Sequence, residues 1–276
     1  MEQKILNTRL RPGQIALFYL GQMGFLLKYS DRYILIDGYL SDYVDRNCCT
    51  DTLRWKRNYP PPIQPEALSF VDYVFCTHAH PDHADPDTLS VLARVNTKAV
   101  FLAPKPILEC IAAFGVSRER LLGVSADQRI PLCPGVSVTP VPAAHEELHQ
   151  REDGAFCELG YLLHLGETTV YHAGDCCPYD GLGGRVQGSH IMILPVNGRD
   201  YYRRYRDDII GCFNPEEAVT LARDARTRLL IPAHLGLYDV NTLNPAQFVD
   251  CLQRAAPYQA FHLFVPGEGY IYDPLL

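Results

Sequence analysis

Short runs of apolar, β-branched and aromatic residues recur along the whole chain, and Gly, Pro and Asp separate them. Runs of this length and composition are typical of strands buried in a sheet. We predict ten such strands, at 15–20, 33–37, 71–78, 99–104, 136–145, 160–165, 169–175, 191–196, 228–234 and 261–266.

Helical spacing of apolar residues falls between several of these strands, at 85–95, 105–116, 214–225 and 244–256. The third segment has the clearest start, because Asn214 suits the N-cap, Pro215 the first position and Glu217 the third, as in a capping box. The first third of the chain is hairpin-like and the later part alternates strand with helix. This order predicts two mixed β-sheets flanked by helices, an α/β (α+β, four-layer) fold.

The length of 276 residues allows one large core, or two fused halves of similar size. The Pro-rich stretch 58–65 is too short for an interdomain linker and is interpreted as a loop. We predict a single domain over 1–276 with two similar halves.

Composition and charge exclude some functional classes. The hydrophobic fraction is 47% and the charged fraction 21%, as in ordinary globular proteins, and the net charge of −7 comes with no long basic run. A partner made of long nucleic acid is therefore not expected. No apolar stretch is long enough to span a bilayer, so no membrane partner is expected either. The sequence leaves a homo-oligomer open.

The ten cysteines do not form a disulfide pattern. Cys48 and Cys49 are adjacent, as are Cys176 and Cys177, and there is no C-x-x-C motif. The N-terminus lacks an apolar segment of signal-peptide length. Together these features predict a cytoplasmic protein with reduced thiols.

A dense group of polar residues follows the predicted strand 71–78, where His78, His80, Asp82 and His83 lie within six residues. All four are good ligands for divalent metals, and polar groups crowded at the end of a buried strand are costly unless something satisfies them. A solvated His-rich turn is the alternative interpretation.

Four predicted strands that are far apart in sequence end in potential metal ligands. In open α/β sheets, ligands bind outside the carboxyl ends of the strands, so these side chains are expected at one common edge. A solvated turn does not predict that pattern. The four residues are His78, His145, Asp175 and His234.

The motif H-x-H-x-D-H at 78–83, followed in order by His145, Asp175 and His234, resembles the metallo-β-lactamase superfamily. The similarity runs from 21–39 to 232–240, which is nearly the whole chain. It implies an αβ/βα sandwich with metals at the common edge of two sheets.

The resemblance also implies how two divalent metal ions, Zn²⁺ or Mn²⁺, would be held. Such ions suit imidazole and carboxylate ligands. Each metal would have three ligands, and one carboxylate would bridge the pair. The first set is His78, His80 and His145, the second set is Asp82, His83 and His234, and the bridge is Asp175.

Single residues distinguish branches of this superfamily. Redox-active di-iron members resemble H-x-E-x-D, so His80 at the second position favours hydrolysis. Antibiotic-hydrolysing members commonly have Cys where this chain has Asp175, and the adjacent Cys176 is interpreted as a packed thiol. The segments 11–28, 115–124, 170–175 and 229–234 are similar to the L-ascorbate-6-phosphate lactonase-like branch.

Two further residues are candidates for a supporting role. Asp37 ends a predicted strand and can orient a ligating His, since such ligands usually donate their other N–H to a carboxylate. Opening a turn with Gly38 is an equal alternative. For His172, just before the turn at Gly174, a role beside the metals and a packing role both stay open.

The segment 195–208 follows the strand 191–196 and brings Asn197 and Arg199 to the expected metal edge. Nothing acidic in 195–199 neutralises the guanidinium, and Arg suits bidentate binding of phosphate. We therefore predict that Asn197 and Arg199 bind a small, anionic, phosphorylated substrate. Arg203, Arg204 and Arg206 are interpreted as parts of a solvated loop.

The predicted function is that of a binuclear metal-dependent hydrolase acting on a small molecule, with Asp82 and Asp175 as catalytic residues. Lactone hydrolysis by a metal-bridging hydroxide is favoured by the branch resemblance. Phosphodiester hydrolysis, as in phosphodiesterases and nucleases, is the alternative because the same site serves both. A metal-binding sensor without turnover is a third hypothesis, which an incomplete ligand set would favour.

Overall fold

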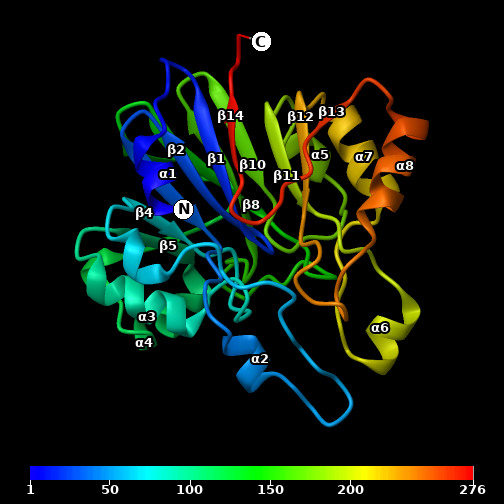
Figure 1. Cartoon of the computed structure of the whole chain (residues 1–276), viewed down its shortest axis with the longest axis horizontal. Helices are drawn as coiled ribbons and strands as arrows, with labels where there is room; N and C mark the ends of the chain where they lie inside the picture. The colour runs from blue at the N-terminus through cyan, green and yellow to red at the C-terminus, as the bar shows by residue number, and fades with distance from the viewer. Residues whose placement is uncertain (276) are drawn as a thin grey trace.

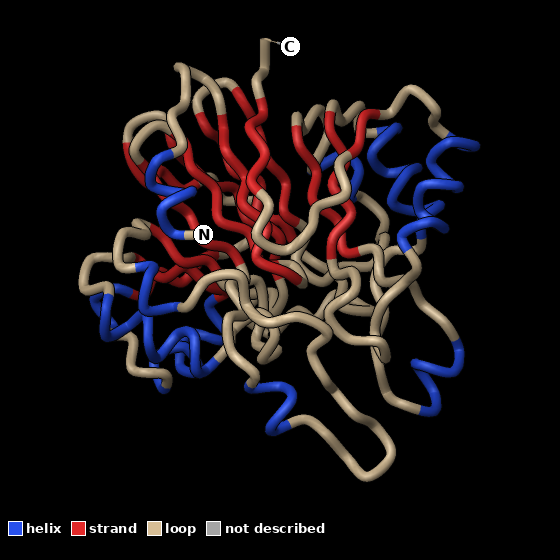
Figure 2. The backbone as a smooth tube through the Cα atoms, viewed as in Figure 1, coloured by secondary structure: helices blue, strands red, loops and turns tan. Residues whose placement is uncertain are grey.

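The computed structural model describes residues 1–275, which form two seven-stranded β-sheets. Figure 2 shows the strands in the middle of the molecule and helices on both flanks. The strand order is β14-β1-β2-β3-β4-β5-β6 in the first sheet and β13-β12-β11-β10-β9-β8-β7 in the second. Each sheet contains antiparallel and parallel pairs, so the predicted pair of mixed sheets is confirmed.

Each sheet is built almost entirely from one half of the chain. The first sheet consists of β1 (Ile15–Gly21), β2 (Gly24–Tyr29), β3 (Arg32–Ile36), β4 (Tyr73–Phe75), β5 (Val100–Pro104), β6 (Leu121–Val124) and β14 (Gly269–Tyr272). The second consists of β7 (Ile130–Cys133), β8 (Val136–Pro142), β9 (Leu159–Leu165), β10 (Thr168–His172), β11 (Ile191–Pro195), β12 (Leu229–Ala233) and β13 (Ala260–Phe261).

The helices are short and lie outside the sheets (Figure 1). They are α1 (Glu2–Asn7), α2 (Tyr43–Asn47), α3 (Pro86–Val95), α4 (Leu108–Ala113), α5 (Leu182–Arg185), α6 (Tyr201–Arg206), α7 (Pro215–Asp224) and α8 (Pro245–Ala255), with 3₁₀ turns η1 (Pro65–Leu68), η2 (Lys105–Ile107) and η3 (Arg118–Arg120). Within the described residues, no helix is long and apolar enough to cross a bilayer.

Strand β1 shows why the predicted strands are apolar at nearly every position. All seven of its residues are buried. Ile15, Leu17 and Tyr19 belong to the core between the sheets, whereas Ala16 and Phe18 belong to the core under the helices. A sheet covered on both faces needs apolar side chains on both faces.

Each outer face is covered by helices that come from the same half of the chain. Leu89 of α3 and Ile111 of α4 pack on the first sheet, and Val219 of α7 and Phe248 of α8 pack on the second. The layers are therefore helices, sheet, sheet and helices. The predicted four-layer fold is confirmed.

The helix predictions agree closely with the structure. Asp85, Asn214 and Asn244 are the N-caps of α3, α7 and α8, and the capping box between Asn214 and Glu217 is present. The predicted helix 105–116 begins as the 3₁₀ turn η2, and α4 ends at Ala113.

Two predictions were wrong. The run 261–266 is not a strand, because β13 ends at Phe261 and the chain then turns so that His262 Nε2 lies 2.8 Å from Glu268 Oε1. The segment predicted as a solvated, charged loop contains α6, and Arg203 donates hydrogen bonds to the carbonyls of Asn197 and Gly198 at 2.9 Å.

Candidate metal centre

The fold brings the predicted strand ends to one edge. His78 follows β4, His145 follows β8, Asp175 follows β10, and His234 directly follows β12. His234 has a left-handed backbone (φ 62°), so the chain turns sharply there. A strained, positive-φ position at a strand end is often functional.

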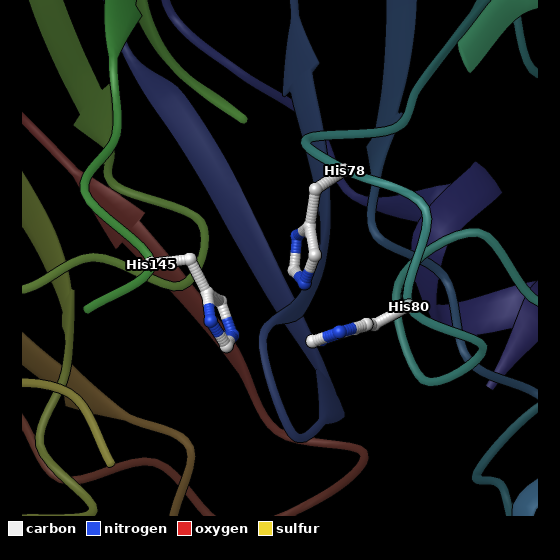
Figure 3. Close-up of side chains that lie close together, drawn as sticks. All are labelled: His78, His80 and His145. Atoms are coloured by element: carbon white, nitrogen blue, oxygen red, sulfur yellow. The ribbon is translucent and has the colours of Figure 1, made fainter. Parts of the chain in front are cut away.

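The residues between His78 and His83 form a tight turn that projects several side chains from one segment. The backbone N–H groups of His83 and Ala84 both donate to the carbonyl of His80, at 2.9 and 2.8 Å. This turn places His78, His80, Asp82 and His83 around the end of β4. Figure 3 shows the rings of His78 and His80 pointing toward His145, which comes from the other sheet.

The seven predicted ligands fall into overlapping groups whose ligand atoms lie within 4.8 Å of one another. This clustering is what two neighbouring metal sites require. The groups are His78, His80 and His145; Asp82, His83 and His234; and His78, His83 and Asp175.

Asp175 lies between the first two groups. Its Oδ1 is 3.3 Å from His83 Nε2, and its Oδ2 is 3.5 Å from His145 Nε2 and 3.4 Å from His234 Nε2. The carboxylate therefore faces both groups, which is the placement that a bridging ligand requires.

Several ligand atoms are buried and have no hydrogen-bond partner: His78 Nε2, His83 Nε2 and Asp175 Oδ1. Unpartnered buried polar atoms cost free energy, and each such atom in a folded protein calls for an explanation. Divalent cations held by these groups would satisfy all three atoms. The residues present fit a metal.

Burial and neighbouring charges shift the pKa values of the candidate ligands in different directions. Burial and the neighbouring His83 and His80 hold the pKa of His78 well below its usual value. Burial also acts to lower the pKa of His83, but the carboxylates of Asp175, Asp82 and Asp37 outweigh it and raise the pKa well above its usual value. Burial would raise the pKa of Asp175, but His83 and His234 together lower it well below its usual value.

Asp37 is fully buried and makes the contact expected of a carboxylate that orients a ligand. Its Oδ2 lies 2.9 Å from His83 Nδ1 and accepts a 2.7 Å hydrogen bond from the Thr77 hydroxyl. Thr77 Oγ1 in turn lies 3.0 Å from His78 Nδ1. One network thus fixes two ring orientations, with Nε2 of both rings facing the site.

His172 supports the site from the core side. Its Nε2 lies 2.8 Å from the carbonyl of Met23, and its Nδ1 accepts a 3.2 Å hydrogen bond from the N–H of Gly174. The ring therefore holds the turn that presents Asp175 against the β1–β2 hairpin. It is both a packed residue and a support of the site.

Gln22, which the sequence-based prediction missed, lies at the tip of that hairpin and is 1% exposed. Its Nε2 donates to Asp82 Oδ2 at 2.8 Å and lies 3.0 Å from His234 Nε2. Its backbone is left-handed (φ 55°), and its carbonyl accepts a 2.9 Å bond from the N–H of His234. The sequence signal was a single amide in a Gly-rich turn between two apolar runs.

Residues 32–235 match the family described as beta-lactamase superfamily domain. The solved metallo-β-lactamase fold protein YhfI from Bacillus subtilis is similar with a TM-score of 0.66 at 16% identity, covering 94% of this chain and 100% of that one. The chain belongs to the metallo-β-lactamase superfamily.

Other superfamily relatives are similar along their full lengths. A UPF0173 metal-dependent hydrolase from Aeropyrum pernix is 26% identical over 272 residues, covering 93% of this chain and 97% of its own length. The solved structure of Igni18, a metallo hydrolase from Ignicoccus hospitalis, has a TM-score of 0.67 at 21% identity and covers 94% of this chain and 99% of that one.

The two predicted substrate-binding residues of this superfamily member make their contacts with residues other than the candidate ligands. Arg199 donates to the carbonyl of Cys212 at 2.6 Å and forms an ion pair with Glu217 of α7. Asn197 is fully buried, where it donates to Asn241 Oδ1 at 2.8 Å and accepts from the N–H of Cys212 at 3.0 Å. The polar groups of both residues bond to other protein groups, and the binding of a phosphorylated substrate by these two residues stays a prediction.

Cys176 is a packed thiol, as predicted. It is fully buried, its Sγ donates to the carbonyl of Cys177 at 3.2 Å, and burial raises its pKa far above the usual value. A thiol in this state is a poor metal ligand and a poor nucleophile.

Proposed function

We propose that this member of the superfamily is a metal-dependent hydrolase that opens a lactone, a cyclic ester. The observation that carries the proposal is the position of Asp175 between two groups of ligand-type side chains that lie at one edge of the two sheets. The metal-dependent hydrolase of Aeropyrum pernix, similar along its full length, supports the reaction class.

Two divalent ions, zinc or manganese, fit these groups. When bound, such ions would supply Lewis acidity toward the substrate carbonyl and would lower the pKa of a water. The proposed first site is His78, His80 and His145, the proposed second site is Asp82, His83 and His234, and Asp175 would bridge them.

The remaining work falls to the protein's own groups. Asp37 and Thr77 hold the rings of His83 and His78 in place, which keeps the site ready before substrate enters. Asp82 has Oδ2 fixed by Gln22, and the described residues give its Oδ1 no hydrogen bond. Oδ1 is therefore free to hold a proton that leaves the attacking water.

A substrate panel tests the proposal. Purified protein loaded with Mn²⁺ or Zn²⁺ is assayed with aliphatic and sugar lactones, and in parallel with bis-p-nitrophenyl phosphate and cyclic nucleotides. We expect lactone opening that a chelator abolishes. Turnover of the phosphodiesters alone would replace the proposal with the phosphodiesterase alternative. Stoichiometric metal binding without turnover of any substrate would favour the sensor hypothesis.

A further inference from the structure

A cavity of about 320 Å³ lies against the candidate metal centre, and its lining contains two kinds of residue. Four lining residues are candidate metal ligands: His80, Asp82, His145 and Asp175. Six others are apolar or aromatic, and we call them the apolar wall: Val44, Cys48, Trp55, Ile209, Ile210 and Tyr238. A larger hollow of about 590 Å³ lies elsewhere and contains none of the seven candidate ligands.

The apolar wall comes from three segments outside the sheets. One contains α2 and the loop after it, the second follows α6, and the third, which carries Tyr238, follows β12 (Figure 1). The wall is therefore an addition to the sheet framework.

The wall is fixed in place by its own contacts. The rings of Trp55 and Tyr238 meet edge to face with centroids 5.3 Å apart. The Tyr238 hydroxyl donates to Asp45 Oδ1 at 2.9 Å and lies 2.8 Å from the hydroxyl of Tyr39. Four side chains thus hold the wall rigid, which lowers the entropy cost of binding against it.

Among the described residues, no lysine or arginine lines the cavity. The lining includes the carboxylate of Asp208, which pairs with Arg204, and Arg204 also pairs with Glu146. A negatively charged group of a substrate would therefore find no unpaired cation among the lining residues.

We propose that the apolar wall binds an uncharged hydrocarbon or aromatic group of the substrate, while the substrate's ester faces the His and Asp side chains. This inference rests on the proposed function and names its substrate class: apolar, uncharged lactones rather than phosphorylated or carboxylated ones. Each methylene buried against such a wall strengthens binding about fourfold.

The first arm of the test measures kcat/KM for γ-butyrolactone, γ-hexalactone and γ-octalactone, and for a lactone of matched length that ends in a carboxylate. We expect kcat/KM to rise about sixteenfold for each two carbons added. The carboxylate analogue should fall to the level of the unsubstituted lactone or below. A flat series, or a preference for the charged analogue, would overturn the inference.

The second arm changes the wall. Trp55→Ala should flatten the dependence on chain length, and Trp55→Phe should restore most of it because an aromatic face remains. Val265→Ala is the matched control, since Val265 is an exposed apolar residue that does not line the cavity. If Trp55→Ala kept the full chain-length dependence, the wall would not be the binding surface.

The third arm measures the binding of ligands that the protein does not hydrolyse. Trp55 is the only tryptophan of the chain, so its emission reports on this cavity alone. Alkyl γ-lactams, which resist hydrolysis, should shift that emission in a saturable way with affinity rising with chain length. Lactam binding of this kind without any lactone opening would refute the proposed function and leave the apolar site standing. Lactone opening without chain-length dependence would refute the apolar binding site and leave the proposed function standing.

Discussion

Asp175 is the residue on which the two groups of ligand-type side chains meet, within 3.5 Å of ring nitrogens of His83, His145 and His234. We expect Asp175→Ala to abolish turnover and to lower the metal content from about two ions per chain to one or less, because both sites lose a shared ligand. Elemental analysis and activity assays on the same preparation measure both effects.

Cys176→Ser is the control for Asp175→Ala, because the Cys176 thiol is buried and donates to the carbonyl of Cys177. It should retain metal content and most activity. A loss of metal in Cys176→Ser as complete as in Asp175→Ala would mean that the wrong residue of this strand end had been assigned to the site.

Gln22 offers a second prediction for a single residue, since its amide holds Asp82 and faces His234. Gln22→Ala should weaken the binding of one metal equivalent about tenfold to a hundredfold, the range found when groups that orient ligands are removed. Competition with a fluorescent chelator measures the affinity for each of the two metal ions separately. The affinity for the other metal ion should be the same as in the unchanged protein.

Gln22→Glu separates two ways in which Gln22 can act. Glutamate keeps the size of the side chain but replaces the N–H donor with a second carboxylate beside Asp82. If the donor matters, Gln22→Glu weakens the same equivalent as Gln22→Ala. Tighter metal binding in Gln22→Glu would show that this position acts through an oxygen ligand instead.

At the scale of elements, helix α7 and the segment before it depend on each other. Glu217 accepts from the N–H of Asn214 at 2.8 Å in the capping box and also pairs with Arg199. We expect Arg199→Ala to lower the free energy of unfolding by about 1 kcal/mol, because a half-exposed ion pair and one hydrogen bond are lost. Urea denaturation measures this change, and KM for the lactone should stay the same.

Arg206→Ala is the matched control, because its guanidinium is 70% exposed and pairs with the adjacent Asp207. Its effect on unfolding should be clearly smaller than that of Arg199→Ala. A rise in KM in Arg199→Ala alone, without a loss of stability, would restore Arg199 as a substrate-binding residue.

The elements that were predicted correctly are those whose signals are local. Asn214, Pro215 and Glu217 specify the start of α7 among themselves, and the apolar runs specify strands that are buried on both faces. The ion pair of Arg199 was not predicted, because its partner Glu217 lies 18 residues further along the chain. The seven ligand-type residues were found because His and Asp at strand ends stand out by chemistry, whereas the amide of Gln22 does not.

At the scale of the whole molecule, metal should bind the two halves together, since the proposed ligands come from both sheets. We expect about two ions per chain and a lower Tm after chelation. An ion at about a thousand times its Kd stabilises the folded state by about 4 kcal/mol, or about 8 °C or more in Tm. Calorimetry with and without chelator measures the change, and an unchanged Tm would contradict a shared centre.

The last strand of the chain pairs with the first. Tyr272 of β14 lies opposite Ile15 of β1, and Lys4 Nζ donates to the carbonyl of Gly267 at 3.1 Å. While the chain is being synthesised, the outer edge of β1 therefore has no partner until residues 269–272 have left the ribosome. An open apolar edge is a template for another chain. Completion of the N-terminal sheet is thus tied to the synthesis of residues 269–272, and slow synthesis of the second half prolongs the exposure to aggregation.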